Sequence, residues 1–533
     1  MTSPPVIDAE IDAEPPRGQF LRAYADGKTQ LMWTRLVADL ETPVSAYLKL
    51  TEGAMSGQAR RHGMTFLLES VEGGAVRGRY SIIGLNPDLI WRAHGAKAEI
   101  NRSPHVTPDA FTPQAKPTLE ALRALLAESR LDVPEGLPPM AAGVFGYMGY
   151  DTVRLVETLP DGRPDALGVP DAILMRPTLI VIFDAVKDEM TVGTPVRPTP
   201  DQTAEAAHAA ACARLHSIVR ALDLPVPEAA RPSADLPPLA EPVSNTTPAE
   251  FQAMVAAAKD YIRAGDVFQV VLSQRFSTPF TLPPFQLYRA LRRTNPSPFL
   301  FHLDFGGFQL VGSSPEILVR VRNGEVTIRP IAGTARRGTT AAEDQHLAQA
   351  LLADPKERAE HLMLLDLGRN DVGRVAEIGS VEVTERFLVE RYSHVMHIVS
   401  NVIGRLDAKH DAIDALMAGF PAGTVSGAPK VRAMQIIDEL EKHKRGPYAG
   451  CVGYFSADGQ MDTCIVLRTG LVKDGMLHVQ AGAGLVYDSI PENEQQECVN
   501  KAKALVRAAE EAVRFARPRK ASVTPGDNGK EFD

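Results

Sequence analysis

Short apolar runs in the first half of the chain alternate with two longer amphipathic segments. The runs Thr65–Leu68, Ala141–Tyr147 and Leu179–Phe183 have the length and composition of buried strands. Apolar residues recur at helical spacing over Thr118–Ser129 and Ala204–Leu222, which predicts helices there. The first half is therefore predicted to mix helices and strands.

The second half carries a longer and less regular series of elements. A helix is predicted over Pro248–Ala264 with Thr247 as its N-cap, and the strongest helical patterns span Ala341–Leu367 and Pro491–Arg514. Ser489, three residues before Glu492, suggests a capping box at the start of the last helix. Extended segments are predicted at Val267–Phe276, Phe299–Leu303, Glu325–Ile331, Arg391–Ile403 and Met476–Ala481. This irregular order favours an α+β fold with antiparallel sheets over a parallel doubly wound fold.

A proline-rich segment separates the two halves. Seven prolines fall within Asp223–Pro248, where no periodic apolar pattern is sustained, so residues 223–248 are predicted to be an interdomain linker. Both ends of the chain are polar and aperiodic, which predicts disordered tails over residues 1–18 and 517–533. Two domains follow, at residues 19–222 and 249–516.

Composition and charge narrow the function classes. Lys and Arg number 57 and Asp and Glu 66 among the 533 residues, a net charge of −9, and no block of five like charges occurs. This pattern argues against a nucleic-acid binder or a binder of anionic membranes. No apolar run approaches the roughly 18 residues of a membrane span and no signal peptide is recognisable, so we expect a cytoplasmic protein. The four cysteines show neither metal-binding nor disulfide spacing and are predicted to be reduced.

Two glycine-containing segments are candidate ligand sites. In Phe420–Lys430 (FPAGTVSGAPK), Gly427 and Ala428 lead into a predicted helix with Pro429 at its first position, so free backbone N–H groups would face an anion such as a carboxylate. An ordinary helix cap is an equally common reading. Gly482 and Gly484 would let a ligand approach a strand backbone, although a turn or bulge is the commoner reason for such a pair.

Four other side chains are candidates for chemistry. Glu360 and Glu497 lie in predicted helices beside apolar stripes; they are either solvated helical acids or inward carboxylates suited to a hard cation such as Mg²⁺. His397 shares a strand face with Val395 and Val399, so it is either a core histidine or a residue of a cleft. Glu316 starts a strand and is either an edge residue or a buried acid with a raised pKa.

Six ordered motifs together resemble the chorismate-utilising enzymes, most closely their anthranilate-forming members. The likeness spans about Gln30 to Phe515 and is densest after Phe251. It implies a catalytic domain of two packed antiparallel sheets with helices outside, which binds chorismate with Mg²⁺, and an N-terminal regulatory part. The motifs are PIAGTARRG (330–338), EHLMLLDLGRNDVGRV (360–375), YSHVMHIVS (392–400), GTVSGAPK (423–430), GAGLVYDSIPENE (482–494) and ECVNKA (497–502).

The resemblance also implies roles for single residues. Glu360 and Glu497 correspond to the Mg²⁺ ligands, and Glu316 to the acid that protonates the departing hydroxyl with His397 and Thr424 nearby. The ring carboxylate is expected at the N–H groups of Gly427 and Ala428. The residues that the resemblance implies for binding the rest of the substrate are Tyr448, Arg468, Gly482, Gly484 and Lys501.

Two positions discriminate among members of this family. Relatives that add water have a lysine base where this chain has Gln269, which cannot take a proton, whereas ammonia needs no such base. Aminodeoxychorismate synthases have a nucleophilic lysine where this chain has Ala332. Both substitutions favour anthranilate over aminodeoxychorismate, isochorismate or salicylate. The alternative from another class is an inactive tryptophan-binding subunit, against which retention of both metal acids argues.

The resemblance implies one partner and one effector. No cysteine has the glycine-flanked context of a glutamine-amidotransferase nucleophile, so ammonia is expected from a separate amidotransferase subunit in a hetero-oligomer. Tryptophan is the expected inhibitor, although Phe299 and Leu300 stand where Tyr and Met are frequent, and Asn401 where Arg is. Its implied site is Glu69 and Ser70 of LLES with Asn295, Pro296, Pro298 and Leu300 of NPSPFLF.

Overall fold

The computed structural model describes residues 11–52, 64–72, 76–160, 162–227, 236–392 and 395–516. The first ten residues of the predicted N-terminal tail, the whole predicted tail 517–533 and residues 228–235 of the predicted linker lie outside this set. The described parts combine helices with strands whose pairings are all antiparallel, which confirms the predicted α+β class.

The strands join in one hydrogen-bonded network with two long rows, and the first row runs from the N-terminal half into the C-terminal half. Its neighbours in order are β1, β8, β7, β3, β2, β11, β12, β21, β22 and β10, with β9 and β18 beside β10. Their bounds are β1 Gln30–Val37, β8 Glu189–Val196, β7 Ala172–Asp184, β3 Val76–His94, β2 Thr65–Glu72, β11 Phe299–Asp304, β12 Gln309–Ser314, β21 Thr469–Lys473, β22 Met476–Leu485, β10 Gln269–Pro279, β9 Val243–Ser244 and β18 Gly427–Ala428.

The second row also starts from β7. It continues through β6, β19, β20, β13, β14 and β17, and β17 pairs in addition with β15 and β16. Their bounds are β6 Gly143–Met148, β19 Cys451–Ser456, β20 Met461–Ile465, β13 Ile317–Arg322, β14 Glu325–Ile328, β17 Val395–Arg405, β15 Ile331–Arg336 and β16 Glu382–Arg391; β4 Lys97–Asn101 and β5 Thr112–Pro113 extend from β3.

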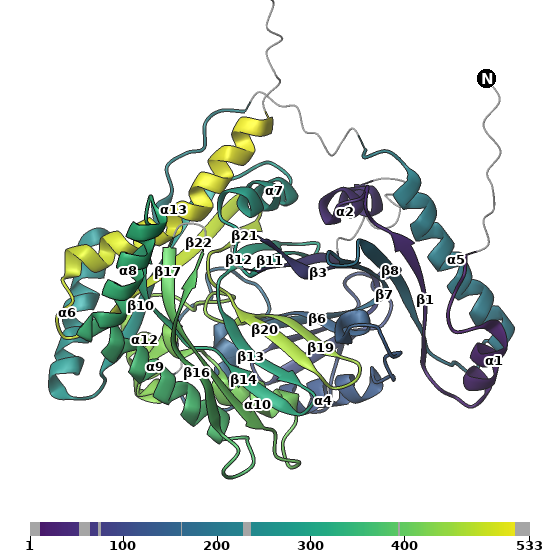
Figure 1. The fold of residues 1–533 in the computed structure, drawn as a ribbon, viewed down its shortest axis with the longest axis horizontal. Coiled ribbons are helices and arrows are strands. Elements are labelled where there is room, and N and C mark those ends of the chain that lie inside the picture. Colours follow the sequence, from purple (N-terminus) through teal and green to yellow (C-terminus); the bar gives the residue numbers. More distant parts are fainter. Residues whose placement is uncertain are drawn as a thin grey trace, which may run out of the picture.

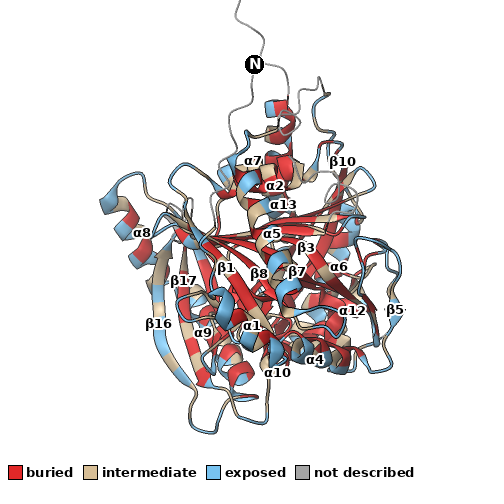
Figure 2. Cartoon of the chain, turned by 90° about the vertical axis from the view of Figure 1, so that its right-hand side faces the viewer, coloured by how far each residue is buried: buried red, intermediate tan, exposed pale blue. Residues whose placement is uncertain are grey.

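Helices cover the outside of this network. Figure 1 shows α6, α8, α9, α12 and α13 on one side and α1, α2 and α5 on the other. In Figure 2 the central strands are almost entirely buried, whereas the helices bury one stripe each. Their bounds are α1 Arg17–Ala25, α2 Pro43–Glu52, α4 Thr118–Glu128, α5 Ala204–Asp223, α6 Pro248–Ala264, α7 Pro284–Thr294, α8 Ala341–Ala353, α9 Pro355–Gly373, α10 Ala412–Gly419, α11 Gly423–Ser426, α12 Lys430–Leu440 and α13 Pro491–Ala516.

Several element predictions are confirmed, and others differ for local reasons. The helix α6 has the predicted bounds, and Thr247 forms a capping box with Glu250. The predicted helix Ala341–Leu367 is wrong as a single element, because Asp354 ends α8 and caps α9, which begins at Pro355. At the last helix, the Ser489 hydroxyl accepts a hydrogen bond from the Val486 N–H at 3.0 Å.

Two predicted strands are interrupted. The segment Glu325–Ile331 divides into β14 and β15 at Pro330, which cannot donate a ladder hydrogen bond. The segment Arg391–Ile403 contains the end of β16 and the start of its antiparallel partner β17, so it is not one strand. A pattern of apolar residues alone does not reveal where a chain turns back on itself.

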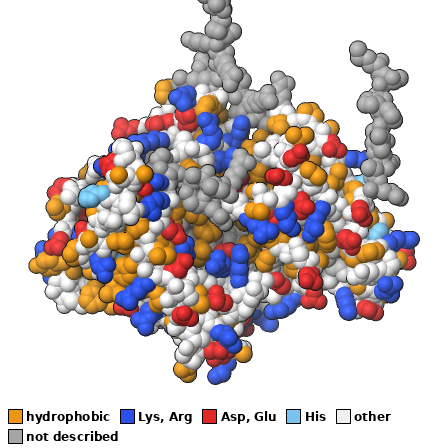
Figure 3. All heavy atoms as spheres, viewed as in Figure 1, with side chains coloured by type: hydrophobic (Ala, Val, Ile, Leu, Met, Phe, Trp, Pro, Cys, Tyr) orange, Lys and Arg blue, Asp and Glu red, His pale blue; other side chains and the backbone are white. Residues whose placement is uncertain are grey.

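The buried core contains residues from both sides of the predicted linker. One cluster joins Trp91 and Leu174 to Val270 and Leu485. Three of the cysteines, Cys451, Cys464 and Cys498, are buried as free thiols. Within the described ranges, no helix is both long and apolar enough to cross a membrane. Figure 3 shows acidic and basic side chains interspersed over one face.

Candidate active site

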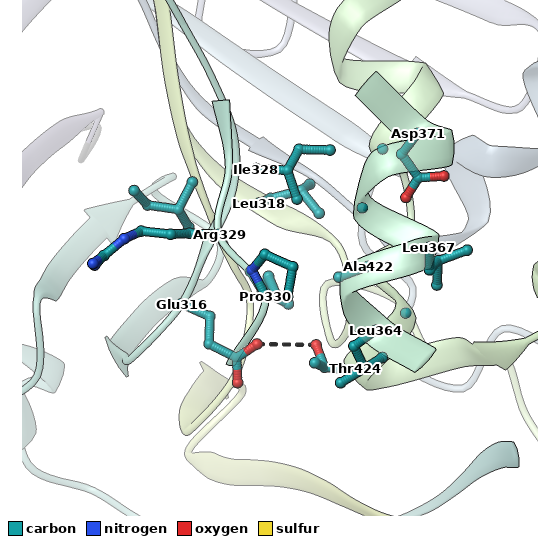
Figure 4. Close-up of a pocket in the computed structure, with 15 residues that line it drawn as sticks. Glu316, Leu318, Ile328, Arg329, Pro330, Leu364, Leu367, Asp371, Ala422 and Thr424 are labelled. Atoms are coloured by element: carbon teal, nitrogen blue, oxygen red, sulfur yellow. Dashed lines mark hydrogen bonds between the residues drawn. The ribbon is translucent and has the colours of Figure 1, made fainter. Parts of the chain in front are cut away.

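Glu316 lies between β12 and β13 and points at Thr424 of the short helix α11. The Thr424 hydroxyl donates to Glu316 Oε2 at 3.0 Å (Figure 4). Burial raises the pKa of Glu316 to about 7, while the hydrogen bond from Thr424 and the positive charges of Arg468 and Lys501 act in the opposite direction. A carboxyl group with this pKa is protonated in a large fraction of molecules near neutral pH.

These two residues stand at one end of a cavity of about 370 Å³. Figure 4 shows Pro330 beside Glu316, and the helix α9 presenting Leu364, Leu367 and Asp371 along the opposite wall. The cavity is mostly apolar near the acid, which explains the direction of its pKa shift.

His397 is half-buried in β17, and its protonation state follows from its neighbours. Its Nδ1 lies 2.9 Å from the Gly333 carbonyl oxygen. Because a carbonyl only accepts hydrogen bonds, Nδ1 carries the proton and Nε2 keeps a lone pair. Burial lowers the pKa of His397, so the ring is neutral at neutral pH.

Arg468 is a half-buried cation in an unusual backbone conformation. Its φ of 47° lies in the left-handed region, where non-glycine residues are uncommon and often functional. Burial lowers the pKa of Arg468, and Glu316 and Tyr392 oppose that shift. No ion pair of Arg468 occurs within the parts of the chain described above. The guanidinium is therefore available to an anionic ligand.

Three glycines of the predicted site are close-packed against neighbouring chain. A Cβ on Gly427, where φ is 128°, would lie 2.1 Å from the Gln269 carbonyl oxygen. A Cβ on Gly482 would lie 2.8 Å from the Tyr448 hydroxyl, and one on Gly484 would lie 2.9 Å from Gln269 Nε2. These close approaches are made by neighbouring parts of the chain, and the approach of a ligand at Gly482 and Gly484 stays a prediction. The prediction that Pro429 is the first helical residue is wrong by one position, because α12 begins at Lys430.

Gln269 is buried at the start of β10 and contacts a candidate metal ligand. Its Nε2 donates to Glu360 Oε1 at 3.2 Å, and its Oε1 has no hydrogen-bond partner among the described residues. A buried acceptor without a partner is costly, and a ligand N–H donor would satisfy it.

Glu360 of α9 and Glu497 of α13 are half-buried. Glu497 Oε1 lies 2.7 Å from Lys501 Nζ, which also donates to the Gly482 carbonyl oxygen at 2.9 Å. No group of three or more His, Cys, Asp and Glu that could hold a metal ion occurs in the described chain. Each acid supplies carboxylate oxygens, which Mg²⁺ prefers, and Mg²⁺ usually keeps several waters and takes further oxygens from its substrate.

A second, more apolar cavity of about 620 Å³ contains part of the predicted effector site. Glu69, Ser70 and Leu300 are among its lining residues, whereas Asn295, Pro296 and Pro298 lie in the connection from α7 to β11 and outside the lining. The Glu69 carboxylate is engaged by Arg292, with two contacts of 3.0 Å, and by the Tyr288 hydroxyl.

Sequence analysis missed several residues at the second cavity. Tyr454 and Cys464 line the second cavity from β19 and β20, and Arg292 holds Glu69 from α7. In sequence they are an ordinary strand pattern and a basic residue in the last turn of a helix, so only the pairing of distant strands marks them.

The comparisons with known proteins agree with this geometry. A model of the chorismate binding enzyme family matches residues 76–507. Anthranilate synthase component 1 of Cereibacter sphaeroides is 58% identical over 498 residues, which span 93% of this chain and 98% of that protein. The chain belongs to the chorismate binding enzyme family. The family predicted from the six motifs is thereby confirmed.

Two solved structures of chorismate-utilising enzymes resemble this one. Anthranilate synthase component I from Streptococcus pneumoniae TIGR4 has a TM-score of 0.72 and 39% identity, covering 89% of this chain and 99% of that one. The menaquinone-specific isochorismate synthase from Escherichia coli has a TM-score of 0.66 at 19% identity, covering 93% and 98%. The second likeness concerns the fold alone.

Proposed function

We propose that this chain acts as the aminating component of an anthranilate synthase, in the first step of tryptophan biosynthesis. Chorismate and ammonia would give anthranilate, pyruvate and water. The observation that carries the proposal is the 58% identity to an anthranilate synthase component 1 across 93% of the chain. Gln269 and Ala332 support amination, because neither side chain can act as the base or the nucleophile of the sister reactions.

The proposed mechanism assigns the leaving-group step to Glu316. Its raised pKa keeps a proton available for the departing ring hydroxyl, and Thr424 orients the carboxyl group. His397, neutral and held through Nδ1, would face the same hydroxyl with Nε2. Ammonia carries its own lone pair, and the Gln269 Oε1 acceptor would orient its N–H groups.

The same proposal places the two carboxylates of chorismate. The N–H groups at Gly427 and Ala428 would bind the ring carboxylate. The enolpyruvyl carboxylate would be bound by Arg468, by Tyr448 and by the backbone at Gly482 and Gly484. Glu360 and Glu497 would hold Mg²⁺, which when bound neutralises charge on the ring carboxylate. Lys501 would then exchange its contact with Glu497 for one with substrate.

A separate amidotransferase subunit is part of this proposal. The relatives named component 1 imply a second component. Burial raises the pKa of Cys451 and of Cys498 to about 12, and it also raises the pKa of Cys464 and Cys212. Thiols this weakly acidic are poor nucleophiles near neutral pH, so glutamine hydrolysis is assigned to the partner.

In this proposal the linker separates a regulatory part of the chain from a catalytic domain. Residues 19–222 would form the regulatory part and 249–516 the catalytic domain, with the strand network arranged as two packed antiparallel sheets and helices outside. The two rows that leave β7 support this arrangement. Tryptophan would bind in the second cavity, between strands of both parts.

The purified chain, given chorismate, Mg²⁺ and ammonium at alkaline pH, is expected to release anthranilate and pyruvate in equal amounts. Anthranilate is measured by its fluorescence and pyruvate with lactate dehydrogenase, after chromatographic separation. Omission of ammonium is the control. Salicylate, isochorismate or aminodeoxychorismate as the main product would contradict the proposal.

Ser70→Ala is expected to weaken inhibition by tryptophan by about tenfold while turnover without tryptophan stays near normal. The Ser70 hydroxyl lies at the cavity, where it donates to the Tyr80 carbonyl, and a lost hydrogen bond typically costs about 0.5 to 1.5 kcal/mol, of which the upper end corresponds to about tenfold. The concentration for half-inhibition is measured at fixed chorismate. Ser217→Ala, on the exposed face of α5, is the matched control. Equal inhibition of all three proteins would remove Ser70 from the effector site.

A further inference from the structure

The ion pair between Arg445 and Glu441 is buried behind the proposed substrate site. We propose that this pair positions the backbone segments that meet both carboxylates of chorismate. The inference rests on the proposed function and deepens it. Neither residue would touch the substrate, so both are positioning residues. Neither is part of the motif set that identified the family.

The pair itself is bidentate and almost completely excluded from solvent. Arg445 Nη2 lies 2.6 Å from Glu441 Oε1, and Arg445 Nε lies 3.0 Å from Glu441 Oε2. The two side chains are 1% and 5% exposed. Because removing two charges from water is expensive, such a pair is favourable only when its remaining hydrogen-bonding groups are also satisfied.

Arg445 uses its remaining donors on the chain near the proposed ring-carboxylate site. Its Nη1 donates to the Val425 carbonyl at 2.7 Å, and Val425 lies between Thr424 and Gly427. Its Nη2 also donates to the Val271 carbonyl of β10 at 2.7 Å, and Val271 is the register partner of Gly484. One guanidinium therefore fixes α11 relative to β10.

Glu441 fixes the part of β10 that pairs with Gly482. Its Oε1 accepts from the Ser273 N–H at 2.8 Å and from the Ser273 hydroxyl at 2.9 Å. Ser273 is the register partner of Gly482, and its hydroxyl also accepts from Gln480 Nε2 at 2.8 Å. The Arg445 guanidinium lies 5.6 Å from the centre of the Tyr448 ring. The pair therefore contacts α11 directly, lies beside Tyr448, and reaches Gly482 and Gly484 of β22 through their register partners in β10.

These contacts of the buried pair would help a net-acidic protein to bind a dianion. Backbone N–H groups bind a carboxylate well only if they are held in place before it arrives. A planar guanidinium with directed donors can hold three segments at once, whereas a lysine supplies a point charge. Loss of the pair should therefore weaken substrate binding more than the chemical step.

The test compares Arg445→Lys and Glu441→Gln with the control Asp438→Asn. Asp438 lies in α12, the helix that ends just before Glu441, and is buried in an ion pair with Arg154 at 2.7 Å. Among the described residues, no hydrogen bond joins its side chain to α11, β10 or β22. Chorismate affinity is measured by calorimetry with Mg²⁺ and without ammonium, alongside KM, kcat and the melting temperature. Binding of chorismate does not depend on which product forms, so a failure of the proposed function would appear separately as a wrong product of the wild type.

We expect both pair variants to raise KM and Kd for chorismate about tenfold or more, with kcat changed less than about threefold. The control should lower the melting temperature while KM stays within about twofold of wild type. Unchanged KM in the folded pair variants, or an equal rise in the control, would overturn the inference. If Arg445→Lys does not fold, Ser273→Ala replaces it. Because that variant removes only one of the contacts of Glu441, a smaller rise in KM of about threefold is required, and a smaller change would overturn the inference.

Discussion

Glu316→Gln is expected to lower kcat by about 10² to 10⁴-fold, the usual contribution of a general acid. Glutamine preserves the shape of the side chain and can accept a hydrogen bond from Thr424, but it has no acidic proton to give to the departing hydroxyl. Anthranilate formation at saturating chorismate, ammonium and Mg²⁺ measures the effect. Chorismate binding should remain within a few-fold of wild type, because Glu316 is assigned to the chemical step.

The pH dependence of the wild-type enzyme gives an independent check on this acid. The pKa of Glu316 is raised to about 7, and the acid must be protonated to act. The value of kcat/KM, expressed per concentration of free ammonia, should therefore be highest below pH 7 and fall as pH rises through the pKa of the free enzyme. Expressing rates per free ammonia removes the opposite rise that comes from ammonium deprotonation.

Thr424→Val should move the fall of kcat/KM with rising pH, the descending limb of the pH profile, to higher pH. The Thr424 hydroxyl stabilises the charged form of Glu316 and so lowers its pKa, and its removal leaves burial less opposed. Glu325→Gln, at the exposed first residue of β14, is the control and should leave the pH of this fall unchanged. A limb at the same pH in all three proteins, or a Glu316→Gln enzyme with near-normal kcat, would remove Glu316 from the leaving-group step.

Glu497→Gln is expected to reduce turnover below about 1% of wild type. Even groups that contact only a metal ligand typically contribute about 10 to 100-fold, so direct loss of a carboxylate ligand should cost at least as much. Activity is measured as a function of Mg²⁺ concentration, because a weakened site should require far more Mg²⁺ for any residual rate.

Loss of Glu497 also releases Lys501 from its ion pair, and a control must separate the two effects. Lys501→Met removes the same ion pair while keeping both carboxylates, so its Mg²⁺ dependence should stay near that of wild type even if its KM for chorismate rises. Glu510→Gln, at an exposed position of α13, should change neither. Wild-type turnover by Glu497→Gln at limiting Mg²⁺ would remove Glu497 from the metal site.

Features set by neighbouring residues could be predicted well from sequence. The bounds of α6 follow from a capping box at one end and a left-handed Gly265 at the other. Chain reversals were less predictable, since the β16 to β17 connection lies inside one continuous extended pattern.

Contacts between distant segments could not be predicted. Nothing in VFQVVL or in the helix around Glu360 indicates that the Gln269 amide donates to that carboxylate, because 91 residues separate them. In the same way nothing in LLES or in the sequence of α7 indicates that Arg292 and Tyr288 contact the Glu69 carboxylate. Residue types suggested the chemistry of the site, but tertiary packing decided which pairs meet.

The pairing of β2 with β11 and of β6 with β19 crosses the proline-rich segment twice. Splitting the gene at that segment would therefore strip four strands of their neighbours, and fragments with such bare edges tend to aggregate. Two coexpressed fragments would have to associate before either could fold into a soluble form. Evolutionary exchange of the half before the proline-rich segment is correspondingly constrained, because any incoming half must match the other one along both of these strand pairings.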